Sequence, residues 1–148
     1  MCPRDSRTVW LTFGLIIAAG ICGCGGGASA SATSSSEASL DAGLKAFQEK
    51  DWATAETNLS AAIANGHLQP DLTESALRSL AVSRIHLDKL PAAESDLMVL
   101  SQGAADMDLY WVACAELELK KGDQEAAKNA AIQARELNPD VELPSELQ

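Results

Sequence analysis

The side chains best able to do chemistry in this 148-residue chain are its four cysteines and two histidines. Cys22 and Cys24 flank a single glycine. Two thiolates at this spacing can ligate a metal or form a redox pair, but a Cys-x-Cys pair with no further Cys or His nearby is an incomplete ligand set. The sequence on either side must therefore show what these two cysteines do.

The remaining candidates for catalysis or metal binding are scattered. Cys114 occupies a small-residue packing position of an expected helix, which predicts a buried, inert thiol. His67 falls in an expected loop and His86 on a helix, and neither has a Cys or His partner at metal-binding spacing. We expect both to be surface histidines.

The acidic pairs do not form a reactive constellation either. Asp106 and Asp108, and likewise Glu116 and Glu118, are two residues apart and so point to different sides of a helix. The sequence also has no phosphate-binding loop, nucleophile elbow or zinc motif. We therefore expect a protein that is not an enzyme and that binds no metal or other cofactor.

The N-terminal segment has the layout of an export signal. Arg4 and Arg7 precede an almost continuously apolar run, Val9–Ile21. As a helix this run rises about 20 Å, short of the roughly 30 Å hydrocarbon core of a bilayer. A basic start, a short apolar core and small residues after it are typical of a secretory signal.

Ile21-Cys22-Gly23-Cys24 resembles the lipobox of bacterial lipoproteins. In that pattern an aliphatic residue stands three before the modified cysteine and a small residue directly before it, places that Ile21 and Gly23 fill for Cys24. The resemblance implies cleavage after residue 23, a diacylglycerol on the sulfur of Cys24 and an acyl chain such as palmitate on the new N-terminus. Several acyl chains make a durable membrane anchor.

Two alternatives stay open for this segment. One is plain secretion, with cleavage near Ala28 or Ala30, or an uncleaved anchor; the other is the metal or redox pair. Gly25–Ser36 contains only small residues and has no periodicity, which predicts a flexible linker.

The charge excludes some partners. From Cys24 onward, nine Lys and Arg stand against twenty Asp and Glu, a formal charge of −11. Such a surface repels phosphate backbones, so we expect no nucleic-acid binding.

Comparison of the chain with itself reveals three related units, which begin near Ala42, Leu80 and Cys114. Small side chains let paired helices approach closely. In each unit the last three of the recurring positions are spaced by four and then three residues, which places them on one helix face. Small or apolar residues recur in register at four positions, namely Gly43/Ala81/Ala115, Ala55/Ala93/Ala127, Leu59/Leu97/Ala131 and Ala62/Leu100/Ala134.

These units resemble the tetratricopeptide repeat, whose period is about 34 residues. The third unit matches best, through Trp111, Gly122-Asp123 and Leu137-Asn138-Pro139, and the second is the most degenerate. The resemblance implies an all-α fold of three helical hairpins in a short right-handed solenoid. We expect a signal peptide at 1–23, the lipidated cysteine and linker at 24–36, the repeat domain at 37–139 (units 36–69, 74–107 and 108–141) and a tail at 140–148.

Turn and capping residues place six helices within the repeat domain. Asp51, Asp71 (with Glu74 three residues later) and Asp123 are expected N-caps, and Gly66 and Gly122 are expected stops. The expected helices are 37–49, 52–65, 72–87, 91–101, 107–121 and 124–137. Because the tail is short, the last hairpin is expected to leave apolar surface for a partner.

In tetratricopeptide folds the first helix of each hairpin lines a concave groove, so the resemblance implies a largely apolar groove suited to a hydrophobic peptide or helix. An alternative is that its residues pack within the hairpins or lie under the tail. The residues of this predicted groove are Leu40, Leu44, Phe47, Arg78, Val82, Ile85, His86, Val112, Glu116 and Leu119.

Together these patterns predict a non-catalytic scaffold for protein–protein interaction, lipid-anchored in the cell envelope on the outer membrane or periplasmic face. The partner is expected to be a protein or peptide. Alternative roles are a subunit of an envelope assembly or secretion machine, a chaperone-like receptor for exported hydrophobic peptides, and an accessory subunit of an envelope enzyme.

Overall fold

The computed structural model describes residues 29–148, and these residues form six α-helices and one short 3-10 helix, with no strand among them. The all-α class predicted from the sequence is therefore confirmed for this part of the chain. The elements are α1 (Ser29–Gln48), α2 (Trp52–Ala64), α3 (Pro70–His86), α4 (Leu90–Leu100), α5 (Met107–Lys121), α6 (Gln124–Leu137) and η1 (Ser145–Leu147).

The predicted signal peptide, Cys24 and the first part of the predicted linker lie outside the described residues. Among the helices that are described, none combines the length and apolar character that crossing a bilayer requires.

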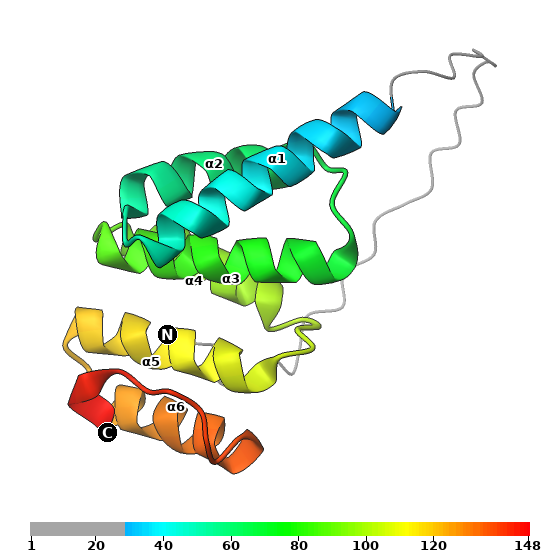
Figure 1. The fold of residues 1–148 in the computed structure, drawn as a ribbon. Coiled ribbons are helices and arrows are strands. Elements are labelled where there is room, and N and C mark those ends of the chain that lie inside the picture. The colour runs from blue at the N-terminus through cyan, green and yellow to red at the C-terminus, as the bar shows by residue number, and fades with distance from the viewer. Residues whose placement is uncertain (1–28) are drawn as a thin grey trace, which may run out of the picture.

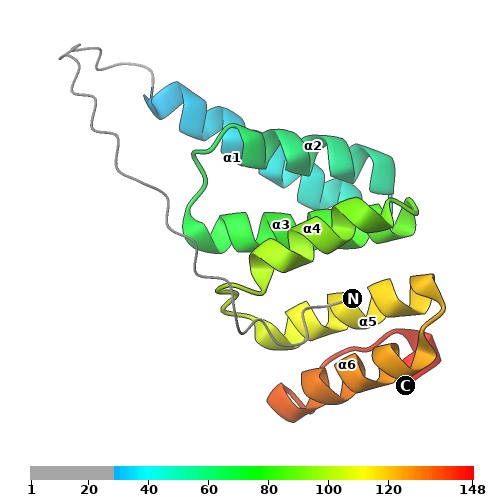
Figure 2. The same cartoon turned by 180° about the vertical axis from the view of Figure 1, so that it is seen from behind.

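Consecutive helices pack as pairs, α1 with α2, α3 with α4 and α5 with α6, and the pairs stack along one direction (Figure 1). The first helices touch one another, because α3 contacts both α1 and α5. The second helices α2 and α4 lie on the opposite side of the stack (Figure 2). One continuous face is therefore built from the first helices.

The three turns inside the pairs have the same geometry. Lys50, Asp88 and Gly122 all adopt left-handed backbone angles, with φ of 60°, 58° and 84°. In each turn the next residue donates its backbone N–H to a carbonyl five residues earlier, at 2.9, 2.8 and 2.9 Å. The three turn positions have the same spacing along the chain as the repeated small residues Gly43, Ala81 and Ala115. Only the third turn carries the glycine that this conformation favours.

Close packing of small side chains holds each pair together. Gly43, Ala81 and Ala115 are buried, as are their counterparts on the second helices. A Cβ atom added at Gly43 would lie 2.7 Å from Cγ of Leu59, so α1 and α2 meet there with no room for a methyl group. The predicted close approach is therefore confirmed for α1 and α2.

Ion pairs join helices both within a pair and between neighbouring pairs. Arg84 of α3 binds both oxygens of Asp96 on α4, at 2.8 and 2.7 Å, and contacts Glu56 of α2 at 3.4 Å. Lys121 of α5 pairs with Glu94 of α4. These contacts fix the stacking of the hairpins and so position the faces described below.

Two of the three predicted N-caps are confirmed. The side chain of Asp51 accepts the backbone N–H of Thr54 at 3.2 Å, and Asp123 accepts that of Ala126 at 3.0 Å. The third was wrong, because α3 begins at Pro70, whose fixed φ suits a first helical position. Asp71 therefore lies inside the first turn.

The structure differs from the predicted linker over 29–36, which forms the first turns of α1. Ser36 is fully buried. The segment contains no glycine or proline to interrupt a helix, and its alanines favour helix once the packed residues that follow have nucleated it. The folded domain therefore begins before the predicted boundary at residue 37.

The tail also differs from expectation, because it covers the end of the last hairpin. Leu143 is 5% exposed and packs with Ala131 and Ala134 of α6. Val141 and Leu147 pack against the same cluster, together with Trp111 of α5. Three apolar side chains spaced along the tail suffice to hold it there without a capping helix. The apolar surface expected at this end is therefore largely covered.

Candidate functional site

The predicted groove lies on the face formed by α1, α3 and α5, but two of its residues are in the core. Leu40 is 2% exposed and Ile85 is 1% exposed. Leu40 packs in a cluster with Leu59 of α2, and Ile85 in one with Leu97 of α4. Both point into their own hairpins, so neither is accessible to a partner.

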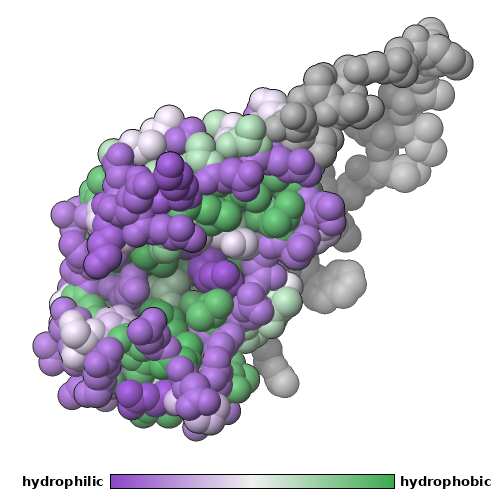
Figure 3. Space-filling view, viewed as in Figure 1, coloured by the Kyte–Doolittle hydropathy of each residue, from purple (hydrophilic) through white to green (hydrophobic). Residues whose placement is uncertain are grey.

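Three other apolar residues of the predicted groove are only partly buried. Leu44 and Phe47 of α1 pack on the outside of the first cluster, and Val82 of α3 on the outside of the second. We call these three residues the α1–α3 face. Figure 3 shows an apolar area over α1 and α3 on this side of the molecule.

The tail packs against the part of the predicted groove that lies on α5. Val112 packs against the cluster that contains Leu143, and Leu119 is half-buried. In Figure 3 a second apolar area lies over α5 and the tail, separated from the first by polar side chains. The tail therefore occupies the α5 end of the predicted groove.

Arg78 is held at the junction of α3 and α5. Its guanidinium lies 3.3 Å from the carboxylate of Asp106, which precedes α5. Glu74, one turn earlier on α3, accepts the backbone N–H groups of Ala105 and Asp106 at 2.9 and 3.0 Å. These backbone hydrogen bonds lower the pKa of Glu74. The carboxylate thus caps α5 from a neighbouring hairpin.

His86 lies at the other end of the α1–α3 face, between an aromatic and an acidic neighbour. Its ring stacks on Trp52 of α2, with centroids 4.1 Å apart and planes 9° from parallel. Trp52 in turn meets Phe47 edge to face at 5.5 Å. Burial lowers the pKa of His86, and the charges of Lys120 and Lys50 lower it further, so the imidazole is neutral at pH 7.

Glu116 of α5 faces His86, with Oε2 4.0 Å from Nε2 of the imidazole. Among the described residues this Oε2 is buried and has no hydrogen-bond partner. Burial, together with the charge of Glu146 in the tail, raises the pKa of Glu116 to about 7. The carboxyl is therefore half protonated near neutral pH.

Sequence reasoning missed Trp52 and Glu146. Trp52 belongs to a different hairpin from His86, and no pattern in the sequence pairs the two residues. Only the stacking of hairpins brings the two rings together. Glu146 could not be placed because the position of the tail was unknown.

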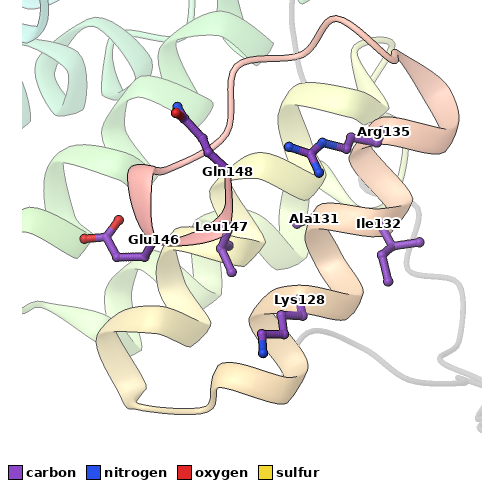
Figure 4. Close-up of a pocket in the computed structure, with 7 residues that line it drawn as sticks. All are labelled: Lys128, Ala131, Ile132, Arg135, Glu146, Leu147 and Gln148. Carbon is purple, nitrogen blue, oxygen red and sulfur yellow. The ribbon is translucent and has the colours of Figure 1, made fainter.

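A second concave feature lies between α6 and the tail (Figure 4). This α6–tail depression has a volume of about 300 Å³. Its lining residues are Lys128, Ala131, Ile132, Arg135, Glu146, Leu147 and Gln148. Sequence reasoning missed this site too, although the spacing of Lys128, Ile132 and Arg135 by four and three places all three on one side of α6.

The described residues hold no cluster of three or more His, Cys, Asp or Glu side chains placed to bind a metal ion. Cys114 is fully buried, as predicted. His67 is exposed and lies in the loop after α2, as predicted. These side chains are therefore not brought together into a site.

Comparison of the chain with protein-family models, with curated proteins and with solved structures gave no match.

Proposed function

We propose that the protein is a lipid-anchored, non-catalytic scaffold that binds a protein or peptide partner in the cell envelope. The observation that carries the proposal is the α1–α3 face, where Leu44, Phe47 and Val82 remain partly exposed over a well-packed stack. Partly exposed apolar side chains on a rigid face are the usual means by which helical arrays hold an apolar peptide.

The repeat geometry supports a tetratricopeptide-like array. The same left-handed turn recurs at Lys50, Asp88 and Gly122, and first helices pack on first helices. In such an array each hairpin buries its surface against its neighbours, and the line of first helices is left as a binding face.

The anchor rests on the sequence around Cys24. A lipid on this thiol would tether the domain to the outer membrane or to the periplasmic face of the envelope. The residues between Cys24 and the packed part of α1 would then set how far the domain stands from the lipid surface.

Polar groups at both ends of the α1–α3 face would orient the partner. Arg78 and its ion pair with Asp106 lie toward one end, and His86 with Glu116 toward the other. A neutral imidazole can accept or donate a hydrogen bond, so His86 favours a polar backbone or side chain of the partner over a charge.

Three specific roles fit this mode of action and differ in stoichiometry. A subunit of an envelope assembly or secretion machine would co-purify with its partner in a fixed ratio. A chaperone-like receptor for hydrophobic peptides would hold many clients transiently. An accessory subunit would change the rate of an envelope enzyme.

The experiment is crosslinking in intact cells, followed by purification of the full-length chain from membranes. The wild type is compared with Cys24→Ser. We expect a defined partner adduct in the membrane fraction for the wild type and its loss from that fraction for the variant. A wild-type chain that forms no adduct with any protein would overturn the proposal.

A further inference from the structure

The α6–tail depression combines an apolar floor with two cationic edges. Ala131 and Leu147 line it, and Ile132 is 53% exposed at its rim. Lys128 and Arg135 lie on either side of Ile132 along α6 (Figure 4). An opening of about 300 Å³ has room for one or two large side chains.

The two cations are not paired within the described part of the chain. Neither Lys128 nor Arg135 forms an ion pair or a side-chain hydrogen bond there. The lysines and arginines that form ion pairs in this part of the chain are Arg78, Arg84, Lys89, Lys120 and Lys121. Glu146 also lines the depression, but Figure 4 shows its carboxylate pointing away from α6.

The lining of the depression contains two cations and one carboxylate, whereas the domain from Cys24 onward carries twenty acidic and nine basic side chains. A cationic pair beside an exposed isoleucine on such a surface complements an acidic, apolar ligand. The overall negative charge disfavours an anionic membrane as that ligand, because long-range repulsion opposes the approach of the domain to such a surface.

The spacing of the cations fits a helix. Residues seven apart on α6 are separated by about 10 Å along its axis. Residues seven apart on an incoming helix are separated by the same distance. The residues three and four positions after the first of them lie on the same side of that helix. Carboxylates at the outer positions and an apolar side chain between them would therefore match Lys128, Ile132 and Arg135.

We propose that the α6–tail depression binds an acidic amphipathic helix of a protein partner. An apolar side chain of that helix packs against Ala131, Ile132 and Leu147, and two carboxylates pair with Lys128 and Arg135. Arg135 accommodates a carboxylate with two parallel N–H donors, and Lys128 acts as a point charge.

The inference extends the proposed scaffold function, on which it rests, to a second surface. The α6–tail depression shares no residue with the α1–α3 face. A partner can therefore contact both surfaces, or two partners can bind together.

The test measures binding of fluorescently labelled helical peptides to the full-length chain in detergent micelles, by fluorescence anisotropy. The acidic–apolar peptide carries two glutamates seven residues apart, with leucines three and four residues after the first glutamate, in an alanine background. One control peptide has lysines in place of the glutamates, and the other has serines in place of the leucines.

We expect the acidic–apolar peptide to bind and both control peptides to bind about tenfold more weakly or not at all. Arg135→Glu and Lys128→Glu should each weaken binding by about tenfold. Lys45→Glu is the matched control, because Lys45 is an exposed residue of α1 with no ion pair among the described residues, and it should leave binding unchanged.

Equal binding of the lysine peptide, or binding that survives Arg135→Glu, would overturn the inference. So would binding of the chain to phosphatidylglycerol vesicles that is lost in the same variants while the peptide does not bind. If the peptide fails but a partner crosslinks at the α1–α3 face, this inference fails and the proposed function stands.

Discussion

The carboxylate of Glu74 on α3 accepts the backbone N–H of Asp106, at the start of α5, at a distance of 3.0 Å. The side chain of Asp106 does not cap α5, and the carboxylate of Glu74 instead holds the backbone at the start of that helix. The contact couples the stacking of two hairpins to the stability of a helix end.

We expect Glu74→Ala to lower the free energy of unfolding by about 1 kcal/mol at pH 7, the usual effect of losing a helix cap. The folded-state pKa of Glu74 is lowered, so its stabilising effect is present above its ordinary pKa and is lost as the pH falls through the lowered value. Urea unfolding at pH 7 and pH 3 measures this. Glu49→Ala, an exposed site, is the control, and an equal loss from both variants at pH 7 would contradict the cap.

Glu116→Gln should change the pH dependence of stability in the opposite sense. Burial raises the pKa of Glu116 from 4.5 to about 7 in the folded state. Ionisation of this carboxyl therefore lowers the free energy of unfolding progressively between pH 4.5 and pH 7, and the loss is complete above pH 7. That loss is about 3 kcal/mol at most. The variant should match the wild type near pH 4.5 and exceed it at pH 8.

The neighbours of Glu116 make a control necessary, because His86 and Glu146 both face it. Glu125→Gln removes one carboxylate from an exposed position on α6 and should leave the profile as in the wild type. Parallel stability profiles for wild type and Glu116→Gln between pH 5 and pH 8 would show that Glu116 is not buried as described.

Gly43→Ala should destabilise the protein by about 1–3 kcal/mol, because the new methyl group has to displace Leu59. Gly103→Ala is the matched substitution, since a Cβ atom there meets nothing within 4 Å and the backbone is not left-handed. Thermal unfolding of the two variants checks the prediction. Equal melting temperatures would mean that α1 and α2 do not approach as closely as the structure places them.

Cys24→Ser should release the full-length chain from membranes, because the lipid attached to this thiol would be lost. Cys22→Ser provides a close control, since it changes the neighbouring cysteine and should leave sedimentation with membranes unaltered. The measurement is fractionation of cells followed by immunoblotting. Release by Cys22→Ser alone would show that the lipid is on Cys22 and not on Cys24. Release by neither variant would contradict the lipid anchor.

Local signals in the sequence predicted the helices well. The bounds of α5 and α6 agree with the prediction, because Gly122 stops one helix and Asp123 caps the next within two residues. The start of α3 was placed two residues late, because Pro70 and Asp71 both resemble helix starts. Whether serines such as Ser36 form a linker or a helix depends on what they pack against.

The site was predicted less well, because it depends on the rotation of each helix and on distant contacts. Leu40 and Ile85 were assigned to the groove from repeat phase, yet one residue along a helix turns the side chain by about 100°. The tail could not be placed, since its three apolar residues Val141, Leu143 and Leu147 are too few to give a periodic pattern. The stacking of Trp52 on His86 joins two hairpins and leaves no local pattern.

The presence of a partner on the α1–α3 face is tested most directly by a photo-crosslinking amino acid placed at Leu44 of the full-length chain in intact cells. Met98, 57% exposed on α4, is the control position, and far-UV circular dichroism verifies that both variants are helical. We predict a defined protein adduct from position 44 and none from position 98. A folded chain that gives no adduct at position 44, or the same adducts at both positions, would contradict a partner-binding α1–α3 face.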